Sequence, residues 1–190
     1  MRTFIAFELP EEIKSGLARL QEEIKVSGAD VKWIRPENLH LTLKFIGKAS
    51  EEQAEKITLM IQEAAGKNSP FMMQIATIGA FPKIDFPRVI WAGLDKGDAE
   101  AKKIAAELEK ETQMLGIAKE ERKFSSHITI GRVRSGKNRL KLVKILKELT
   151  DKPRERFPEV NIGRITLFKS TLTPQGALYE SLSEATLKTT

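Results

Sequence analysis

The segment His40-Leu41-Thr42-Leu43 is followed, 87 residues later, by the similar segment His127-Ile128-Thr129-Ile130. Both have the order His-apolar-Thr-apolar, and together they contain both histidines of the chain. Each lies in an alternating apolar stretch that predicts a β-strand. Because residues i and i+2 of a strand point to one face, each His should emerge beside its Thr. Two such strands lying together would present two imidazoles and two hydroxyls to one cleft.

Predicted strands and helices alternate around these motif segments. The apolar pattern predicts strands over residues 3–9, 31–35, 39–46, 71–81, 89–94, 124–133, 160–172 and 177–182. Helix starts are predicted at Pro10, at the capping box Ser50-Glu51-Glu52-Gln53, and at the N-caps Asp98 and Asn138. Two prolines predict a loop over residues 82–88, and the last two strands should form a closing hairpin.

The resulting order β-α-β-β-α-β-β-α-β-α-β-β mixes helices with strand pairs joined as hairpins. That order predicts an α+β fold with antiparallel sheets. Each half of the chain contains a strand, a helix and one His-x-Thr strand. We therefore expect one domain over residues 1–190, with two lobes related by a pseudo-twofold axis, helices outside and a central cleft.

Composition limits the class of protein and of partner. Apolar residues make up 41% of the 190 residues, enough for a core, and the net charge of +6 with a pI near 9.5 suits a polyanion such as RNA. No cysteine is present, which excludes disulfides, thiol nucleophiles and cysteine metal sites. The N-terminus does not resemble a signal peptide, and no stretch approaches about 18 consecutive apolar residues. We expect a soluble cytoplasmic protein, with a monomer favoured and no membrane partner.

The paired motifs suit acid–base chemistry on a phosphate ester. The Thr42 and Thr129 hydroxyls can donate hydrogen bonds to the charged oxygens of a phosphodiester. One neutral imidazole can remove a proton from a nucleophile, while the other, protonated, donates a proton to the leaving oxygen. A pKa near 6.5 suits histidine to either role around neutral pH. Such a site would need neither metal nor cofactor.

Metal ligation and a serine nucleophile are the rival interpretations. Paired histidines that bind a metal usually have a third ligand nearby, yet neither motif strand contains Asp or Glu. No Ser lies in a Gly-x-Ser-x-Gly elbow. Both rivals are therefore less favoured than the acid–base pair.

Other candidates flank the motifs. A guanidinium at Arg132 could pair with phosphate, and a ring at Phe45 could stack on a base. Strict alternation places both opposite His and Thr, and only a twist or bulge near Gly131 would return Arg132 to the cleft. Lys44 should share the face of His40. A basic track toward RNA could include Arg122, Lys123, Arg134, Lys137 and Arg139.

Nearly the whole chain resembles the two-histidine phosphoesterase superfamily, whose mark is a pair of His-x-Thr-apolar motifs. More narrowly, it resembles the archaeal and bacterial RNA 2′,3′-cyclic phosphodiesterases, also called 2′-5′ RNA ligases. The motif strands continue as Lys44-Phe45-Ile46-Gly47 and Gly131-Arg132. Further support comes from Arg2-Thr3-Phe4-Ile5-Ala6 and Arg88-Val89-Ile90-Trp91-Ala92-Gly93. Such families often have Pro before the second His, where this chain has Ser126.

The resemblance implies a bilobal fold and hydrolysis of an RNA-terminal 2′,3′-cyclic phosphate to a 2′-phosphate. It implies that His40 donates a proton to the departing 3′-oxygen, that His127 activates water, and that Thr42 and Thr129 hold the phosphate. The reverse reaction with an RNA 5′-hydroxyl would join 2′-5′ ends without ATP. The substrates would be nucleotides or RNA ends, including tRNA fragments. A non-catalytic module that binds nucleotides or RNA in the same cleft is the alternative, followed by a structural domain with chance motifs.

Overall fold

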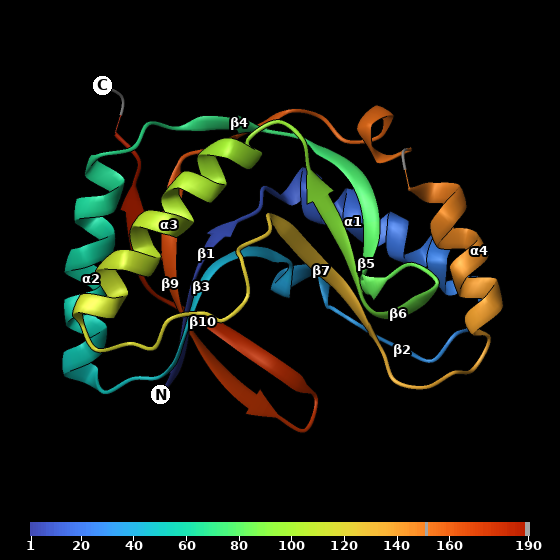
Figure 1. The fold of residues 1–190 in the computed structure, drawn as a ribbon, viewed down its shortest axis with the longest axis horizontal. Helices are drawn as coiled ribbons and strands as arrows, with labels where there is room; N and C mark the ends of the chain where they lie inside the picture. The colour runs from blue at the N-terminus through green and yellow to red at the C-terminus, as the bar shows by residue number, and fades with distance from the viewer. Residues whose placement is uncertain (151, 189–190) are drawn as a thin grey trace.

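The computed structural model describes residues 1–150 and 152–188 (Figure 1). Its elements in chain order are β1 (Arg2–Glu8), α1 (Glu11–Lys25), β2 (Val31–Trp33), the 3-10 helix η1 (Pro36–Asn38), β3 (His40–Lys48), α2 (Glu51–Gly66), β4 (Phe71–Met73), β5 (Ile75–Lys83), β6 (Phe86–Leu94), α3 (Asp98–Met114), β7 (His127–Val133), α4 (Arg139–Leu149), the 3-10 helix η2 (Pro153–Glu155), β8 (Val160–Ile162), β9 (Arg164–Thr173) and β10 (Gly176–Thr186).

Two four-stranded antiparallel sheets form the two lobes. The first lobe has the strand order β10-β9-β1-β3, and the second has the order β2-β7-β6-β5. Strands β4 and β8 form a separate pair. Helices α2 and α3 pack against the first lobe, while α1 and α4 pack against the second (Figure 1). The predicted α+β fold with antiparallel sheets is therefore confirmed.

The two lobes exchange helices. The chain leaves β1 in the first lobe, forms α1 against β7 and α4 of the second lobe, and returns to β3. It later leaves β6 in the second lobe, forms α3 against α2 and β3 of the first lobe, and returns to β7. The two paths correspond under exchange of the lobes, except that the first also contributes β2 to the second sheet between α1 and β3. Each motif strand thus comes after a helix that covers the other lobe.

Local sequence signals explain the helices. The apolar stripe of α1 is fully buried, with Ile13, Leu17, Leu20 and Ile24 at 0–2% exposure. Each such side chain contributes about 1.5–3 kcal/mol relative to exposure. The predicted capping box is confirmed: the Ser50 hydroxyl accepts from the Gln53 N–H at 3.1 Å, and the Gln53 side chain accepts from the Ser50 N–H at 3.0 Å. No helix in the described part of the chain is long and apolar enough to cross a membrane.

One helix start differs from the prediction, and another is confirmed but lacks the expected side-chain bond. Gly97, at φ +87°, is the N-cap of α3, and Asp98 lies in the first turn, where it pairs with Lys102 at 2.6 Å. Asn138 is the N-cap residue of α4, but its side chain makes no capping bond and donates instead to the Gly28 carbonyl at 2.9 Å. Its φ of 52° explains this use, because asparagine tolerates the left-handed region.

Predictions for three stretches were also wrong in their bounds. The stretch predicted as one strand over 160–172 is β8 and β9, which belong to different sheets. The stretch predicted as one strand over 71–81 is two strands in different sheets, separated at Gln74, whose N–H and C=O bond to the segment before α3. The predicted loop over 82–88 is instead a tight hairpin in which Pro82 pairs with Pro87 and Lys83 with Phe86. Prolines are tolerated there because β5 is an edge strand and Pro87 is only the second residue of β6.

A β-bulge follows the threonine of each motif. Lys44 pairs with Ile5 and Thr42 with Ala6, which leaves Leu43 as an extra residue. In β7, Gly131 pairs with Ile90 and Thr129 with Trp91, which leaves Ile130 extra. One extra residue inverts the alternation beyond it. Lys44 and Gly131 therefore face the core.

The same bulges return Phe45 and Arg132 to the face that carries His and Thr, which we call the inner face of each sheet. Phe45 and Arg132 are exposed, whereas Lys44 is buried. The expectations that Phe45 lies opposite His and Thr, and that Lys44 shares the His40 face, were therefore wrong. The bulge near Gly131 that would return Arg132 to the face of His and Thr is present. Strict alternation failed because the strands are bulged.

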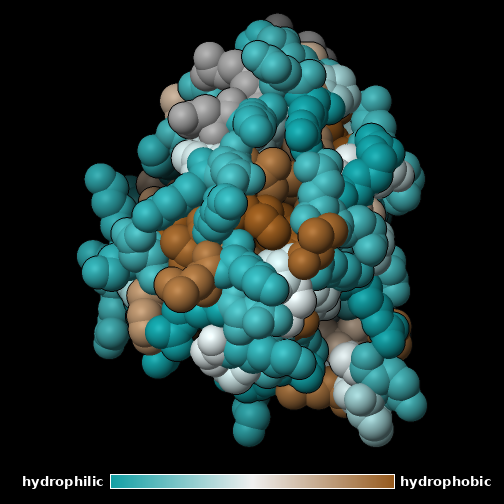
Figure 2. Space-filling view, turned by 90° about the vertical axis from the view of Figure 1, so that its right-hand side faces the viewer, coloured by the Kyte–Doolittle hydropathy of each residue, from teal (hydrophilic) through white to brown (hydrophobic). Residues whose placement is uncertain are grey.

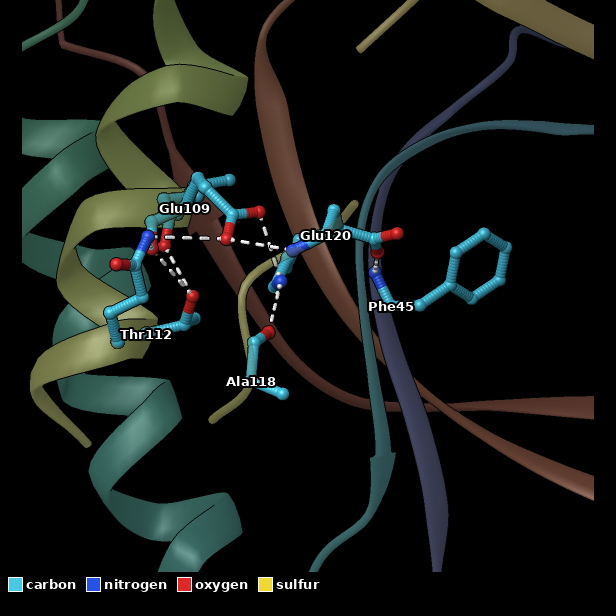
Figure 3. A network of polar contacts seen from close by, with 8 residues as sticks. Phe45, Glu109, Thr112, Ala118 and Glu120 are labelled. Carbon is cyan, nitrogen blue, oxygen red and sulfur yellow. Dashed lines mark hydrogen bonds and ion pairs between the residues drawn. The ribbon is translucent and has the colours of Figure 1, made fainter. Parts of the chain in front are cut away.

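Buried Lys44 ties the first motif strand to α3. Its ammonium group, 1% exposed, donates to the Ala118 carbonyl at 2.9 Å and pairs with the Glu109 carboxylate at 2.9 Å (Figure 3). Glu109 also accepts from the Glu120 N–H, and the Glu120 carboxylate accepts from the Phe45 N–H. Burial opposes ionisation of Glu109, but the bonds from Lys44 and Glu120 lower its pKa. This network anchors β3 where it bulges.

We expect Glu109→Ala to lower the free energy of unfolding by about 3 kcal/mol, because it leaves the Lys44 ammonium buried without its counter-charge. In a Lys44→Met background the same substitution should cost much less, since no buried cation remains. Urea denaturation of the four proteins measures both costs. Equal costs in the two backgrounds would show that the ion pair is not what Glu109 stabilises.

Candidate active site

His40 begins β3, and its ring is held by a hydrogen bond to the backbone two residues earlier in the chain. Its Nδ1 lies 2.7 Å from the Asn38 carbonyl oxygen, and its Nε2 lies 2.9 Å from the Thr42 hydroxyl. A carbonyl only accepts, so Nδ1 carries the proton and Nε2 of the neutral ring is the basic atom. Phe4 packs at 4.7 Å between ring centroids and Tyr179 edge-on at 5.3 Å. The ring is thus held with Nε2 beside the motif threonine.

His127 begins β7 and is held in the same way. Its Nδ1 donates to the Ser125 carbonyl at 2.8 Å, so Nε2 is again the basic atom of the neutral ring. Phe81 packs edge-on at 5.1 Å, and Trp91 lies at 6.4 Å. Both motif histidines therefore use the carbonyl two residues before them to fix the tautomer.

The two motif strands meet although they belong to different sheets. β3 packs against β7, and the positive charge of protonated His127 acts on the His40 ring. Thr42 and Thr129 lie half-buried on the inner faces, next to their histidines. The structure thus brings together the four motif side chains that were predicted to share one site.

The surroundings keep both imidazoles neutral. Burial is the main cause that lowers the pKa of His40 to about 4; the bond to Asn38 opposes it, and the charges of Lys14 and His127 add to it. Burial also lowers the pKa of His127, with a smaller contribution from Arg132. Near pH 7 the ligand-free site therefore holds two bases and no acid. A bound anion would favour protonation of either ring.

Arg132 and Phe45 lie at the border of the site. The Phe45 side chain is 58% exposed, and its ring lies 6.3 Å from that of Phe4. Arg132 is exposed; its charge lowers the pKa of His127 and opposes the rise that burial causes in the pKa of Tyr179. Tyr179 packs on His40, and both belong to the first lobe, whereas Arg132 belongs to the second. The charge of Arg132 therefore acts on groups of both lobes.

Four aromatic rings surround the histidines and were not predicted from the sequence: Phe4, Phe81, Trp91 and Tyr179. Apolar strand residues of this kind usually belong to the core, so periodicity alone did not single them out. One signal was available, because Gly79 and Gly93 lie within predicted strands. A Cβ at these positions would come within 2.2 and 2.8 Å of the Trp91 ring, so only glycine lets the indole lie across the sheet.

Two members of the predicted basic track are placed by their contacts. The Arg139 guanidinium lies over the Phe86 ring at 4.2 Å, at the α4 end of the second lobe. That end is mostly hydrophilic, with apolar side chains gathered between charged ones (Figure 2). Arg122 lies beside Phe45 in a surface pocket next to the end of β3. Among residues 1–150 and 152–188, no three His, Cys, Asp or Glu side chains are grouped so that they could hold a metal ion.

The two halves of the chain each match the same family model, in agreement with the two-lobed architecture. A family model described as LigT like Phosphoesterase matches the chain twice, over residues 7–91 and 94–179. Each match contains one motif, His40-Leu41-Thr42-Leu43 in the first and His127-Ile128-Thr129-Ile130 in the second.

Curated relatives extend over almost the whole chain. An RNA 2′,3′-cyclic phosphodiesterase of Methanocaldococcus jannaschii is 37% identical over 187 residues, which are 97% of this chain and 99% of the relative. A protein of the same name from Aeropyrum pernix is 36% identical over 88% of this chain and 93% of its own length.

Solved structures share the fold. The protein TT0787 of Thermus thermophilus superposes with a TM-score of 0.78 at 26% identity and covers 98% of each chain. E. coli LigT complexed with 3′-AMP gives a TM-score of 0.79 at 23% identity, over 99% of this chain and 98% of that one. With the family match to both halves, these findings show that the chain belongs to the LigT-like phosphoesterases, within the two-histidine superfamily that the paired motifs predict.

Proposed function

We propose that this phosphoesterase hydrolyses RNA-terminal 2′,3′-cyclic phosphate to 2′-phosphate by metal-independent proton transfer between His40 and His127. The observation that carries the proposal is the matched setting of the two rings. Each Nδ1 is bound to a backbone carbonyl, which reserves each Nε2 for proton transfer. The names of the curated relatives, RNA 2′,3′-cyclic phosphodiesterases, support the substrate class.

In the proposed reaction, a water oxygen attacks phosphorus and its proton passes to Nε2 of His127. The bond from phosphorus to the 3′-oxygen breaks, and that oxygen takes a proton from Nε2 of the His40 imidazolium. Thr42 and Thr129 donate hydrogen bonds to the non-bridging oxygens, where negative charge develops. The assignment of acid and base follows the family resemblance. An RNA 5′-hydroxyl in place of water would form a 2′-5′ bond by the same steps.

Because both histidines have lowered pKa values, the substrate must favour protonation of the histidine that acts as the acid. His40 is neutral in the free site, because its pKa lies at about 4. A phosphodiester anion beside the ring would raise that pKa, so proton uptake should accompany binding. Arg132 and Phe45 would bind the substrate, the first through its charge and the second by stacking on a base. The net charge of +6 favours RNA ends as partners.

Replacing either His40 or His127 by Ala should slow hydrolysis of a nucleoside 2′,3′-cyclic phosphate by at least about 100-fold, because each ring transfers a proton. Binding of the 2′-phosphate product should survive in both variants. Steady-state kinetics and calorimetry measure the two effects. Tight binding without turnover in the wild type would identify the chain as a binding module instead.

Thr42→Val and Thr129→Val should each keep shape but lose one donor to the phosphate. A donor of this kind contributes about 2–4 kcal/mol to stabilisation of the transition state, measured as a fall in kcat/KM. Thr186→Val, at an exposed position near the end of β10, is the matched control. Full kcat/KM in both motif variants would mean that the hydroxyls have only a structural role.

The pH profile of kcat/KM should be bell-shaped with its optimum on the acid side, between about 4 and 6.5. One ring must be neutral and the other protonated, and burial lowers the pKa of both in the free enzyme. The profile of kcat should lie at higher pH, because the bound anion raises the pKa of the acid. Both profiles should be unchanged in EDTA. A rate that rises steadily from about pH 5 to 9, or that EDTA abolishes and zinc restores, would contradict the mechanism.

A further inference from the structure

One side chain on the buried face of α1 is polar. Gln21 is 3% exposed and lies within the apolar stripe that α1 packs against the second lobe. Its Nε2 donates to the Ile34 carbonyl at 2.7 Å and to the Ile130 carbonyl at 2.8 Å. Burial of an amide costs free energy unless its donors are bonded, and here both N–H donors are used. The amide therefore joins two backbone segments that lie far apart in the sequence.

The two carbonyls that Gln21 binds belong to the two motif regions. Ile130 is the extra residue of the β7 bulge, directly after Thr129. Its carbonyl also accepts from the Ile34 N–H at 3.0 Å. Ile34 is therefore tied to the bulge twice, directly through its N–H and through its carbonyl by way of Gln21. The bulge of the second motif is thus bonded to the segment that leads to the first motif.

A short bonded path continues from Ile34 to the first histidine. Ile34 is followed by Arg35 and the turn η1, and the Asn38 N–H closes this turn by donating to the Arg35 carbonyl at 2.9 Å. The Asn38 carbonyl in turn accepts from Nδ1 of His40 at 2.7 Å. A shift of the Ile34 carbonyl would therefore be passed to the group that orients the His40 ring.

The first motif strand has a corresponding bond to the segment before the second motif. Lys44, the first residue after the β3 bulge, donates to the carbonyl of Ala118, which lies between α3 and β7 (Figure 3). Here too a helix takes part, because Glu109 of α3 pairs with Lys44. Both bulges are therefore held by a buried polar side chain that also bonds to the segment leading to the other motif.

Proton transfer should be sensitive to these bonds, because the proposed reaction uses both rings at one phosphorus atom. Water gives a proton to His127 while the 3′-oxygen takes one from His40, so both Nε2 atoms must lie within hydrogen-bond reach of their partners in the same complex. A displacement of about 1 Å can slow a reaction about 100-fold. Binding of the product requires no proton transfer and tolerates a larger displacement.

We infer that Gln21 is a positioning residue: it fixes the β7 bulge to the segment before His40 and thereby sets the placement of the two Nε2 atoms relative to each other. Its amide is buried and bonded to the backbone, so it acts through the two motif segments and not by touching the substrate. This inference rests on the proposed function.

Gln21→Met keeps the length of the side chain and removes both donors. For a nucleoside 2′,3′-cyclic phosphate, kcat should fall at least about 10-fold, whereas the Kd of the 2′-phosphate product should change less than about threefold. Affinity for a nucleoside vanadate, whose five-coordinate vanadium imitates the transition state, should fall by the same factor as kcat/KM. Gln21→Asn, whose amide is one methylene too short to reach both carbonyls, should show the same separation of kcat from product binding.

The matched control is Asn68→Leu, which removes another buried amide. Asn68 is 6% exposed, and its Nδ2 donates to the Ala64 carbonyl at 2.9 Å and to the Glu107 carboxylate at 2.7 Å, on helices α2 and α3. These bonds involve neither motif segment, so the control should lower the melting temperature and leave kcat unchanged.

Gln21 variants that fold and keep the kcat of the wild type would overturn the inference. Equal losses of kcat and of product affinity would also overturn it, and so would a similar fall of kcat in Asn68→Leu. If neither Gln21 variant folds while Asn68→Leu does, Gln21 has a structural role alone and the inference is wrong. A wild type that does not hydrolyse the cyclic phosphate would instead overturn the proposed function, so the two failures are distinguishable.

Discussion

One extra residue after each motif threonine decides which side chains of β3 and β7 lie on the inner faces of the two sheets. Without the bulges at Leu43 and Ile130, the lysine and glycine beyond them would lie on the inner faces beside His and Thr, and the ring and guanidinium would face the core. The bulges reverse that order in both lobes at the same position. The buried Lys44 ammonium is a consequence, and its bonds to Ala118 and Glu109 compensate its loss of water.

The site combines fixed tautomers with lowered basicity. Backbone carbonyls hold Nδ1 of each imidazole, so the free enzyme offers two Nε2 lone pairs in a half-buried setting. Burial keeps both rings neutral, and under the proposed mechanism the substrate anion would restore the charge that the acid needs. A neutral ligand of similar shape would then leave both rings unprotonated.

The sequence predicted the elements that depend on short-range signals. Repetition of His-x-Thr located the motif side chains, and the capping box at Ser50 located the start of α2. The prediction of which strand face Lys44 and Phe45 occupy failed, because the bulge depends on pairing between β3 and β1, which no local sequence pattern shows. It also missed Tyr179, which reaches His40 from β10, a strand 139 residues further along the chain. Long-range pairing, not composition, decided these positions.

The exchange of α1 and α3 between the lobes has a mechanical consequence. Each sheet is covered by a helix that follows a strand of the opposite sheet, so neither lobe is built from a continuous half of the chain. The arrangement is that of a domain-swapped dimer joined into one polypeptide. Pulling the lobes apart would drag each helix off the sheet that it covers. The interlocked backbone thus constrains the separation of the two imidazoles.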